Sequence, residues 1–155
     1  MVNRPDFPKS ALFVVSAFLF LLHSACVRFA PAALEDPAVV FDRIVFSSGL
    51  NQKADWAGPV GEKRRFEKGS DPNVYAFLSF GELRGAHTLS WKWYDPSRRL
   101  YRTTDPIDIG EAGKVFERYI AWDVIFVSDD KPNGLWTVAV FMDGRLIGSN
   151  DFEIK

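Results

Sequence analysis

The fold is decided by the stretch Gly134-Leu-Trp-Thr-Val-Ala-Val-Phe-Met-Asp-Gly-Arg-Leu-Ile-Gly148. Two runs rich in β-branched and other apolar residues flank the dipeptide Asp143-Gly144. A type I′ turn needs a positive φ at both of its central residues, and Asp-Gly adopts this conformation readily. The stretch therefore predicts a β-hairpin whose second strand continues to Ile154.

Further strands are predicted upstream of this hairpin, at residues 39–47, 73–80, 87–94, 100–104 and 114–128. In the third of these, Leu89, Trp91 and Trp93 alternate with polar residues, which is typical of a half-buried strand. Turns are expected at 81–85 and 95–99, a connection at 105–110, and a long turn-rich segment at 48–71 with a short strand near 63–66.

About seven strands, with turn signals every 8–15 residues or so, predict an all-β fold. We expect an antiparallel immunoglobulin-like β-sandwich that follows an N-terminal signal segment. A small β-barrel is the alternative. The hairpin is expected to close the sandwich against the Trp91/Trp93 strand, with Trp136 in the core.

The N-terminus has the features of an export signal. Arg4 and Lys9 precede an apolar run at residues 11–22. That run has about 12 residues, whereas a membrane-spanning helix needs roughly 20. We therefore predict a signal peptide at 1–25, a tether at 26–38 and the β-sandwich domain at 39–155.

Cys26, the only cysteine, follows Ser24-Ala25 directly. This arrangement resembles the lipobox of bacterial lipoproteins, and the resemblance implies a lipid on Cys26. His23 departs from the pattern, because an apolar residue is usual at that place. The expected location is outside the cytoplasm, on a bacterial membrane that faces the periplasm or the exterior. A soluble secreted protein and an uncleaved anchor are the alternatives.

A second resemblance rests on Trp91-Lys-Trp-Tyr-Asp-Pro, on Asn133-Gly-Leu-Trp-Thr-Val-Ala-Val-Phe-Met-Asp-Gly and on Phe152-Glu-Ile. Residues 74–155 resemble the immunoglobulin-like domains of the bacterial cell envelope, in which the penultimate strand reads Gly-x-Trp-x-Val-x-Val. The resemblance implies a sandwich without the inter-sheet disulfide. It implies no particular ligand, because such sandwiches have many functions.

Composition argues against several kinds of site. The formal net charge is −1, which gives no reason to expect nucleic-acid binding. One cysteine, and one histidine (His87) outside the signal segment, provide poorly for metal sites or His-paired nucleophiles. We therefore expect no metal, no cofactor and no enzymatic activity.

The predicted function is a membrane-anchored module of the cell envelope or surface, for protein–protein or structural interaction. Its partners would be the membrane, through Cys26, and an envelope protein or polymer. Trp56, Tyr94 and Tyr101 are the candidate binding aromatics, in or beside loops. The basic run Lys63-Arg-Arg65 would suit an anionic partner, but we expect a solvated surface balanced by Glu62 and Glu67.

Two alternative functions stay open. Exposed aromatic side chains would make the domain a carbohydrate-binding module. Convergence of Asp105, Asp108 and Glu111, with His87 nearby, would make it a hydrolase of an envelope polymer.

Overall fold

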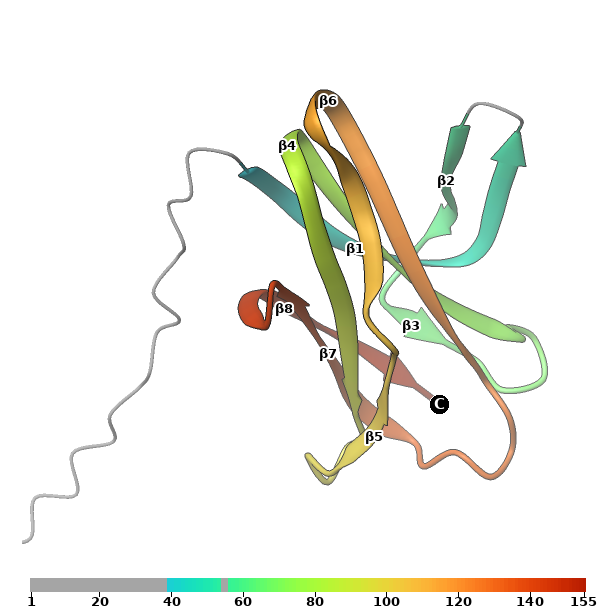
Figure 1. The fold of residues 1–155 in the computed structure, drawn as a ribbon. Helices are drawn as coiled ribbons and strands as arrows, with labels where there is room; N and C mark the ends of the chain where they lie inside the picture. Colours follow the sequence, from blue (N-terminus) through green and yellow to red (C-terminus); the bar gives the residue numbers. More distant parts are fainter. Residues whose placement is uncertain (1–38, 54–55) are drawn as a thin grey trace, which may run out of the picture. The chain divides into compact units, whose positions relative to one another are not determined.

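The computed structural model describes residues 39–53 and 56–155, and its regular elements are strands (Figure 1). In chain order they are β1 (Val39–Lys53), β2 (Trp56–Glu62), β3 (Arg65–Phe66), β4 (Asn73–Tyr94), β5 (Leu100–Thr103), β6 (Ile107–Phe126), β7 (Gly134–Met142) and β8 (Arg145–Ile154). The prediction of an all-β, immunoglobulin-like fold is confirmed. No helix in these two ranges has the length and apolar character needed to cross a membrane.

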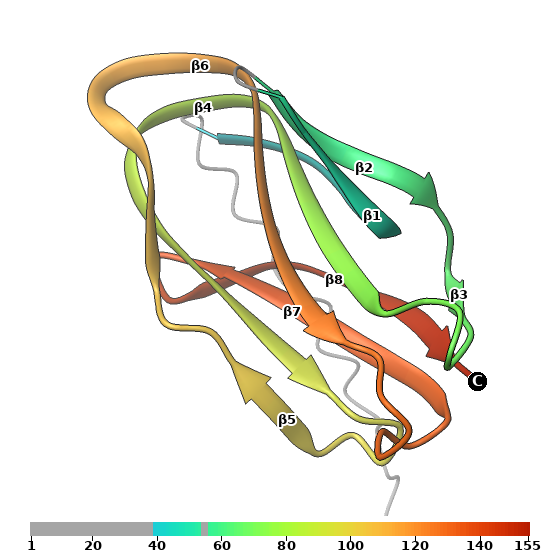
Figure 2. The ribbon, with the colours of Figure 1, turned by 90° about the vertical axis from the view of Figure 1, so that its right-hand side faces the viewer.

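The strands form one curled sheet in the order β2-β1-β4-β7-β8-β3, and β5 and β6 also pair with β4. Figure 2 shows how the sheet folds over itself into two layers. The upper layer holds β1, β2, the first half of β4 and the second half of β6. The lower layer holds the second half of β4 with β5, β7 and β8. All pairings are antiparallel except that of β3 with β8.

The core lies between the layers and is rich in aromatic rings. Trp91, Trp93, Trp136 and Phe152 are fully buried there, with Phe46 from the opposite layer. The rings of Phe46 and Phe152 lie 4.9 Å apart, and Trp93 meets Phe152 edge-on at 5.9 Å. These contacts bridge the two layers, the place that a disulfide occupies in antibody domains.

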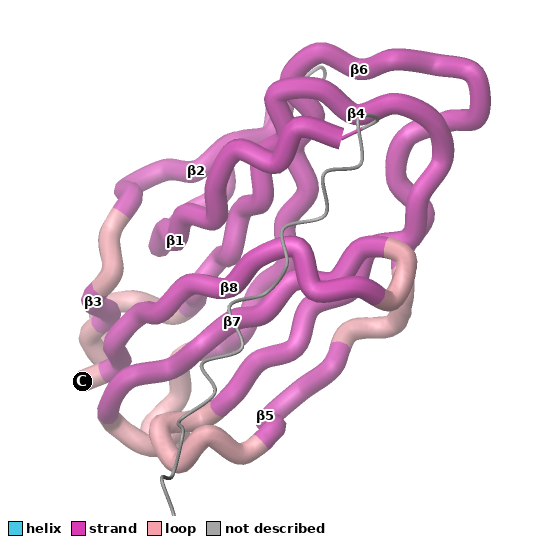
Figure 3. The backbone as a smooth tube through the Cα atoms, turned by 90° about the vertical axis from the view of Figure 1, so that its left-hand side faces the viewer, coloured by secondary structure: helices cyan, strands magenta, loops and turns pink. Residues whose placement is uncertain are grey.

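The C-terminal hairpin forms as predicted. Asp143 and Gly144 have φ values of 51° and 76°, the left-handed conformation that the turn requires. Figure 3 shows β7 and β8 side by side. β7 also pairs with β4, with Val140 opposite Trp91. The hairpin therefore pairs edge to edge with the Trp91/Trp93 strand and extends its layer. The prediction that the hairpin closes the sandwich against this strand is wrong, because the two lie in the same layer.

The predicted turn at 81–85 is wrong, because β4 runs without a break through these residues. Its pairing with β6 continues at Leu83 and Arg84, and the register shifts only between Arg84 and Gly85. Gly85 and Gly110, which approach each other closely there, have φ values of 88° and 70°. The glycines thus allow a β-bulge, at which the paired strands bend from one layer into the other.

Two further boundaries differ from the prediction. The segment 48–71 is largely a hairpin, since β1 continues to Lys53 and pairs with β2. Pro59 lies within β2, which is possible because β2 pairs only with β1 and has one free edge. The predicted connection at 105–110 is also wrong in part, because β6 begins at Ile107.

Candidate functional site

Two of the three candidate aromatics, Tyr94 and Tyr101, lie on the paired strands β4 and β5. Trp56 begins β2, and its side chain lies outside the described residues. Tyr94 ends β4, is half-buried and lies opposite Thr137. Tyr101 is 46% exposed, but its ring packs edge-on against Trp136 at 5.1 Å. Lys131 Nζ donates to the Tyr101 hydroxyl over 2.7 Å. Tyr101 therefore packs over the buried core at Trp136.

Of the acidic residues suspected of catalysis, Asp105 precedes β6, and Asp108 and Glu111 lie on it. Glu111 forms an ion pair with Lys114 (Nζ–Oε2 2.6 Å), and Asp108 lies opposite Thr88 in the β4–β6 ladder. His87 faces a different carboxylate: its Nδ1 lies 2.7 Å from Asp143 Oδ2. Within 39–53 and 56–155, no group of three His, Cys, Asp or Glu side chains is arranged to hold a metal.

The Asp143 carboxylate has a structural role in the turn. Partial burial opposes its ionisation, but the Thr88 amide (2.8 Å) and His87 outweigh that effect, and the pKa of Asp143 lies below its ordinary value. The group joins the β7–β8 turn to β4. We assign the His87–Asp143 pair to the fold rather than to a reaction.

The basic run is mostly neutralised, as expected, but by other residues than predicted. Lys63 forms an ion pair with the buried carboxylate of Asp71, and Arg65 forms one with Glu153 (3.1 Å). Burial raises the pKa of Asp71, but the ion pair with Lys63 and the hydrogen bond from the Glu67 amide lower it by more. The pKa of Asp71 therefore lies below its ordinary value. The Arg64 side chain is exposed and has no hydrogen bond or ion pair with any described residue.

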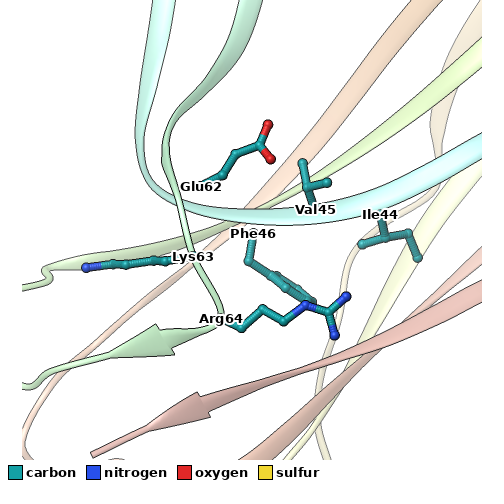
Figure 4. Close-up of a pocket in the computed structure, with 6 residues that line it drawn as sticks. All are labelled: Ile44, Val45, Phe46, Glu62, Lys63 and Arg64. Carbon is teal, nitrogen blue, oxygen red and sulfur yellow. The ribbon is translucent and has the colours of Figure 1, made fainter.

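Arg64 borders an open hollow of 290 Å³ between β1 and the segment that joins β2 to β3 (Figure 4). The residues that line it are Ile44, Val45, Phe46, Glu62, Lys63 and Arg64. Ile44 and Phe46 belong to the buried core and give the hollow an apolar floor. In Figure 4, Phe46 and Arg64 lie on one side of β1, and Glu62 lies on the other.

The backbone of β1 adds hydrogen-bond donors to this hollow. The carbonyl of Ile44 accepts from Asn150 Nδ2 of β8 (2.8 Å), and that of Phe46 accepts from the Lys63 amide (3.0 Å). Both carbonyls therefore point away from β4. In an antiparallel strand, the N–H and C=O of one residue face the same edge. The N–H groups of Ile44 and Phe46 consequently face the hollow as well.

On the Arg64 side of β1, the hollow thus presents donors above an apolar floor, while the carboxylate of Glu62 lies on the other side of β1. The Arg64 carbonyl accepts from the Glu153 amide (2.8 Å), which fixes the base of the side chain beside β8. A guanidinium and two amides are donors only, so the group that fits them is an acceptor with negative charge. The basic run is visible in the sequence, but nothing there indicates that Arg64 alone stays unpaired.

Comparison with known proteins adds the fold alone. No protein-family model and no curated protein matches the sequence. A Pseudomonas fluorescens alkylpurine DNA glycosylase, bound to DNA with an abasic site analog, is similar over 76% of this chain and 30% of its own, with 10% identity and a TM-score of 0.51. The chain therefore spans less than a third of that enzyme.

Two smaller proteins also have similar structures, each over 76% of this chain. An immunoglobulin-like protein of Pseudomonas aeruginosa has 12% identity, 96% of its length covered and a TM-score of 0.40. A Niemann-Pick type C2 protein of the Japanese carpenter ant has 13% identity, 93% of its length covered and a TM-score of 0.40.

The glycosylase corrects two predictions. The sequence predicts no enzymatic activity because it has few cysteines and histidines, yet an enzyme contains a similar fold. The predicted partners, which excluded nucleic acid because of the net charge, are also wrong, since that enzyme is bound to DNA. Neither exclusion follows from the sequence, and a fold shared at 10% identity assigns no activity to this chain.

Proposed function

We propose that this chain is a binding module that takes an extended segment of another protein into the hollow beside β1. The immunoglobulin-like sandwich supplies the scaffold. The observation that carries the proposal is the unpaired Arg64 guanidinium on the edge of β1 to which the N–H groups of Ile44 and Phe46 are directed. An extended segment offers backbone carbonyls to a strand edge, and a carboxylate on it would pair with Arg64.

Arg64→Gln should weaken binding of a carboxylate-bearing peptide about tenfold, the effect of losing one charge-assisted contact. A suitable probe is N-acetyl-Val-Thr-Val-Glu with a free C-terminus. Its affinity is measured by titration followed in ¹⁵N-resolved NMR spectra. We expect the amide signals of Ile44 and Phe46 to shift in the parent protein and to respond much less in the variant.

Arg65→Gln is the matched control, because Arg65 is also exposed but already paired with Glu153. It should leave the affinity unchanged. A single-stranded oligonucleotide forms a second arm, since phosphate is also an anionic acceptor. If the oligonucleotide shifts these signals and the peptide does not, or if both arginine variants behave alike, the proposed protein-binding role is wrong.

We also propose that the module is exported and held at a membrane by a lipid on Cys26. Support comes from the signal-like residues 1–25 and from the place of Cys26 directly behind Ser24-Ala25. These residues lie outside the described part of the chain. Several acyl chains on one cysteine would give stable attachment, since each buried CH₂ contributes about 0.8 kcal/mol.

Cys26→Ala should move the protein from the membrane fraction to the soluble fraction and remove the lipid from its intact mass. The reason is that this thiol is the only cysteine available for a lipid. His23→Leu restores the usual lipobox pattern and serves as the control, with attachment retained or increased. A parent protein that is soluble and has no added mass would show that no lipid is attached.

A further inference from the structure

A second apolar surface lies on the outer face of the upper layer. Residues of β4 alternate, and Tyr75 and Phe77 face away from the core that their neighbours enter. Phe77 is only 2% exposed although it is outside the core, because Tyr75 (6.1 Å between ring centroids) and the cross-strand residue Trp122 surround it. Tyr75 meets Trp122 edge-on at 5.9 Å. An aromatic patch therefore lies on the face of β4 and β6 that is turned away from the core.

The backbone of β6 has a free edge beside this patch. The Val127 amide donates to the Pro72 carbonyl (2.8 Å), which shows that the odd-numbered residues at this end of β6 bond to β4. The even-numbered residues then direct their N–H and C=O groups the other way. These residues are Ile120, Trp122, Val124 and Phe126. Within the described chain β6 pairs only with β4, so no strand lies at this second edge.

The edge has little of the charge that normally prevents pairing with another chain. Residues 119–127 contain one charged side chain, Asp123. Its carboxylate turns inward, where it accepts from Trp93 Nε1 (2.7 Å) and pairs with Arg102. Phe126 is 71% exposed. A long apolar edge of this kind is a template for a further strand.

We propose that this edge pairs with the same edge of a second copy of the chain, antiparallel, about a twofold axis at Trp122. In this register Trp122 lies opposite Trp122 of the second copy, and Ile120 lies opposite Val124. Apolar outward side chains of one copy then lie opposite apolar outward side chains of the other. The backbone N–H and C=O groups of the two strands also face each other at the paired positions. Such self-complementarity is the property of an isologous interface.

The charge of Asp123 favours the register with its axis at Trp122 over the register with its axis one residue further along. A twofold axis at residue 123 would place two Asp123 residues directly opposite each other, which is unfavourable for like charges. The axis at Trp122 places Asp123 opposite Ala121 and brings Arg118 beside the exposed Phe126 ring. The regular edge ends there, because Arg118 has a φ of 58°. This surface lies across β4 from β1, so the pairing does not depend on the proposed hollow.

The full chain should form dimers by sedimentation velocity, and Val124→Pro should raise the dissociation constant about tenfold or more. Proline removes an N–H that points to the free edge, while the ladder to β4 stays intact. Val124→Thr keeps that N–H and the β-branched shape, and it should leave the dimer formed. Near-UV circular dichroism shows whether both variants keep the native packing.

The register has its own test in chains that also have Cys26→Ser. Opposed residues in a hydrogen-bonded pair have Cα atoms about 5.5 Å apart, within the range for a disulfide. A mixture of Ile120→Cys and Val124→Cys chains should therefore cross-link, and either variant alone should not. A monomeric parent chain, a dimer that Val124→Pro leaves intact, or cross-linking of Ile120→Cys with itself would each overturn the proposal.

Discussion

Trp136→Ala is expected to lower the free energy of unfolding by about 3–5 kcal/mol, the range for emptying a large aromatic site in a core. Trp136 has no exposed surface, and its ring stacks with Phe152 at 6.3 Å between centroids. Its Nε1 donates to the Pro132 carbonyl (3.1 Å), which would lose this donor. Urea denaturation followed by far-UV circular dichroism measures the loss.

Leu135→Ala is the matched control for this change. Leu135 precedes Trp136 on β7 but points outward and is 59% exposed. Its truncation should change the free energy of unfolding by less than about 0.5 kcal/mol. A loss for Trp136→Ala no larger than that of Leu135→Ala would contradict the assignment of Trp136 to the core.

The local signals of the sequence predicted the hairpin and the core strands correctly. The turn of the hairpin depends on two adjacent residues, Asp143 and Gly144, and their φ preference is the same in any context. The inward faces were equally predictable. Alternation at Leu89, Trp91 and Trp93 needs only one strand and one buried side, and all three side chains are buried.

The course of β4 could not be predicted in the same way. Glycine at 81 and 85 permits both a reversal of the chain and a bulge in a continuous strand. The choice between them depends on β6, whose pairing at Leu83 and Arg84 keeps β4 extended. That partner is distant in sequence, and no residue near Gly85 identifies it.

The hollow could not be predicted from the sequence either, although the basic residues beside it are adjacent in the chain. Lys63, Arg64 and Arg65 are adjacent, but their partners Asp71 and Glu153 come from separate segments. Only the folded chain shows that two of the three cations are paired. The edge of β1 depends likewise on Asn150 of β8, which fixes the direction of the Ile44 carbonyl.

The failed exclusions have a different cause. The count of histidines and cysteines and the net charge describe what chemistry a chain supplies most easily. They do not describe which proteins use its fold, and a DNA glycosylase contains a similar one. The oligonucleotide arm of the peptide titration therefore addresses a real alternative. It compares two anionic ligands at the same arginine.

Gly110→Ala is the second change with a large expected effect, a loss of about 2–5 kcal/mol in the free energy of unfolding. Gly110 lies opposite Ala86, beside the bulge where β4 and β6 bend from one layer to the other. A Cβ on Gly110 would overlap the carbonyl oxygen of Gly85 and also approach Leu83 Cδ2 at 3.3 Å. In addition, the φ of 70° is unfavourable for alanine.

Gly113→Ala separates these two causes, because Gly113 has a similar φ of 77° but no atom within 4 Å of the position that a Cβ would take. Gly113→Ala should lower the free energy of unfolding only because alanine is unfavourable at a positive φ, by about 1–2 kcal/mol. The difference between the two variants, measured by urea denaturation, then reports the contact between the backbones of Gly85 and Gly110. Equal losses would mean that the strands separate easily at the bend. In that case the close β4–β6 approach would contribute nothing to the stability of the corner that joins the two layers.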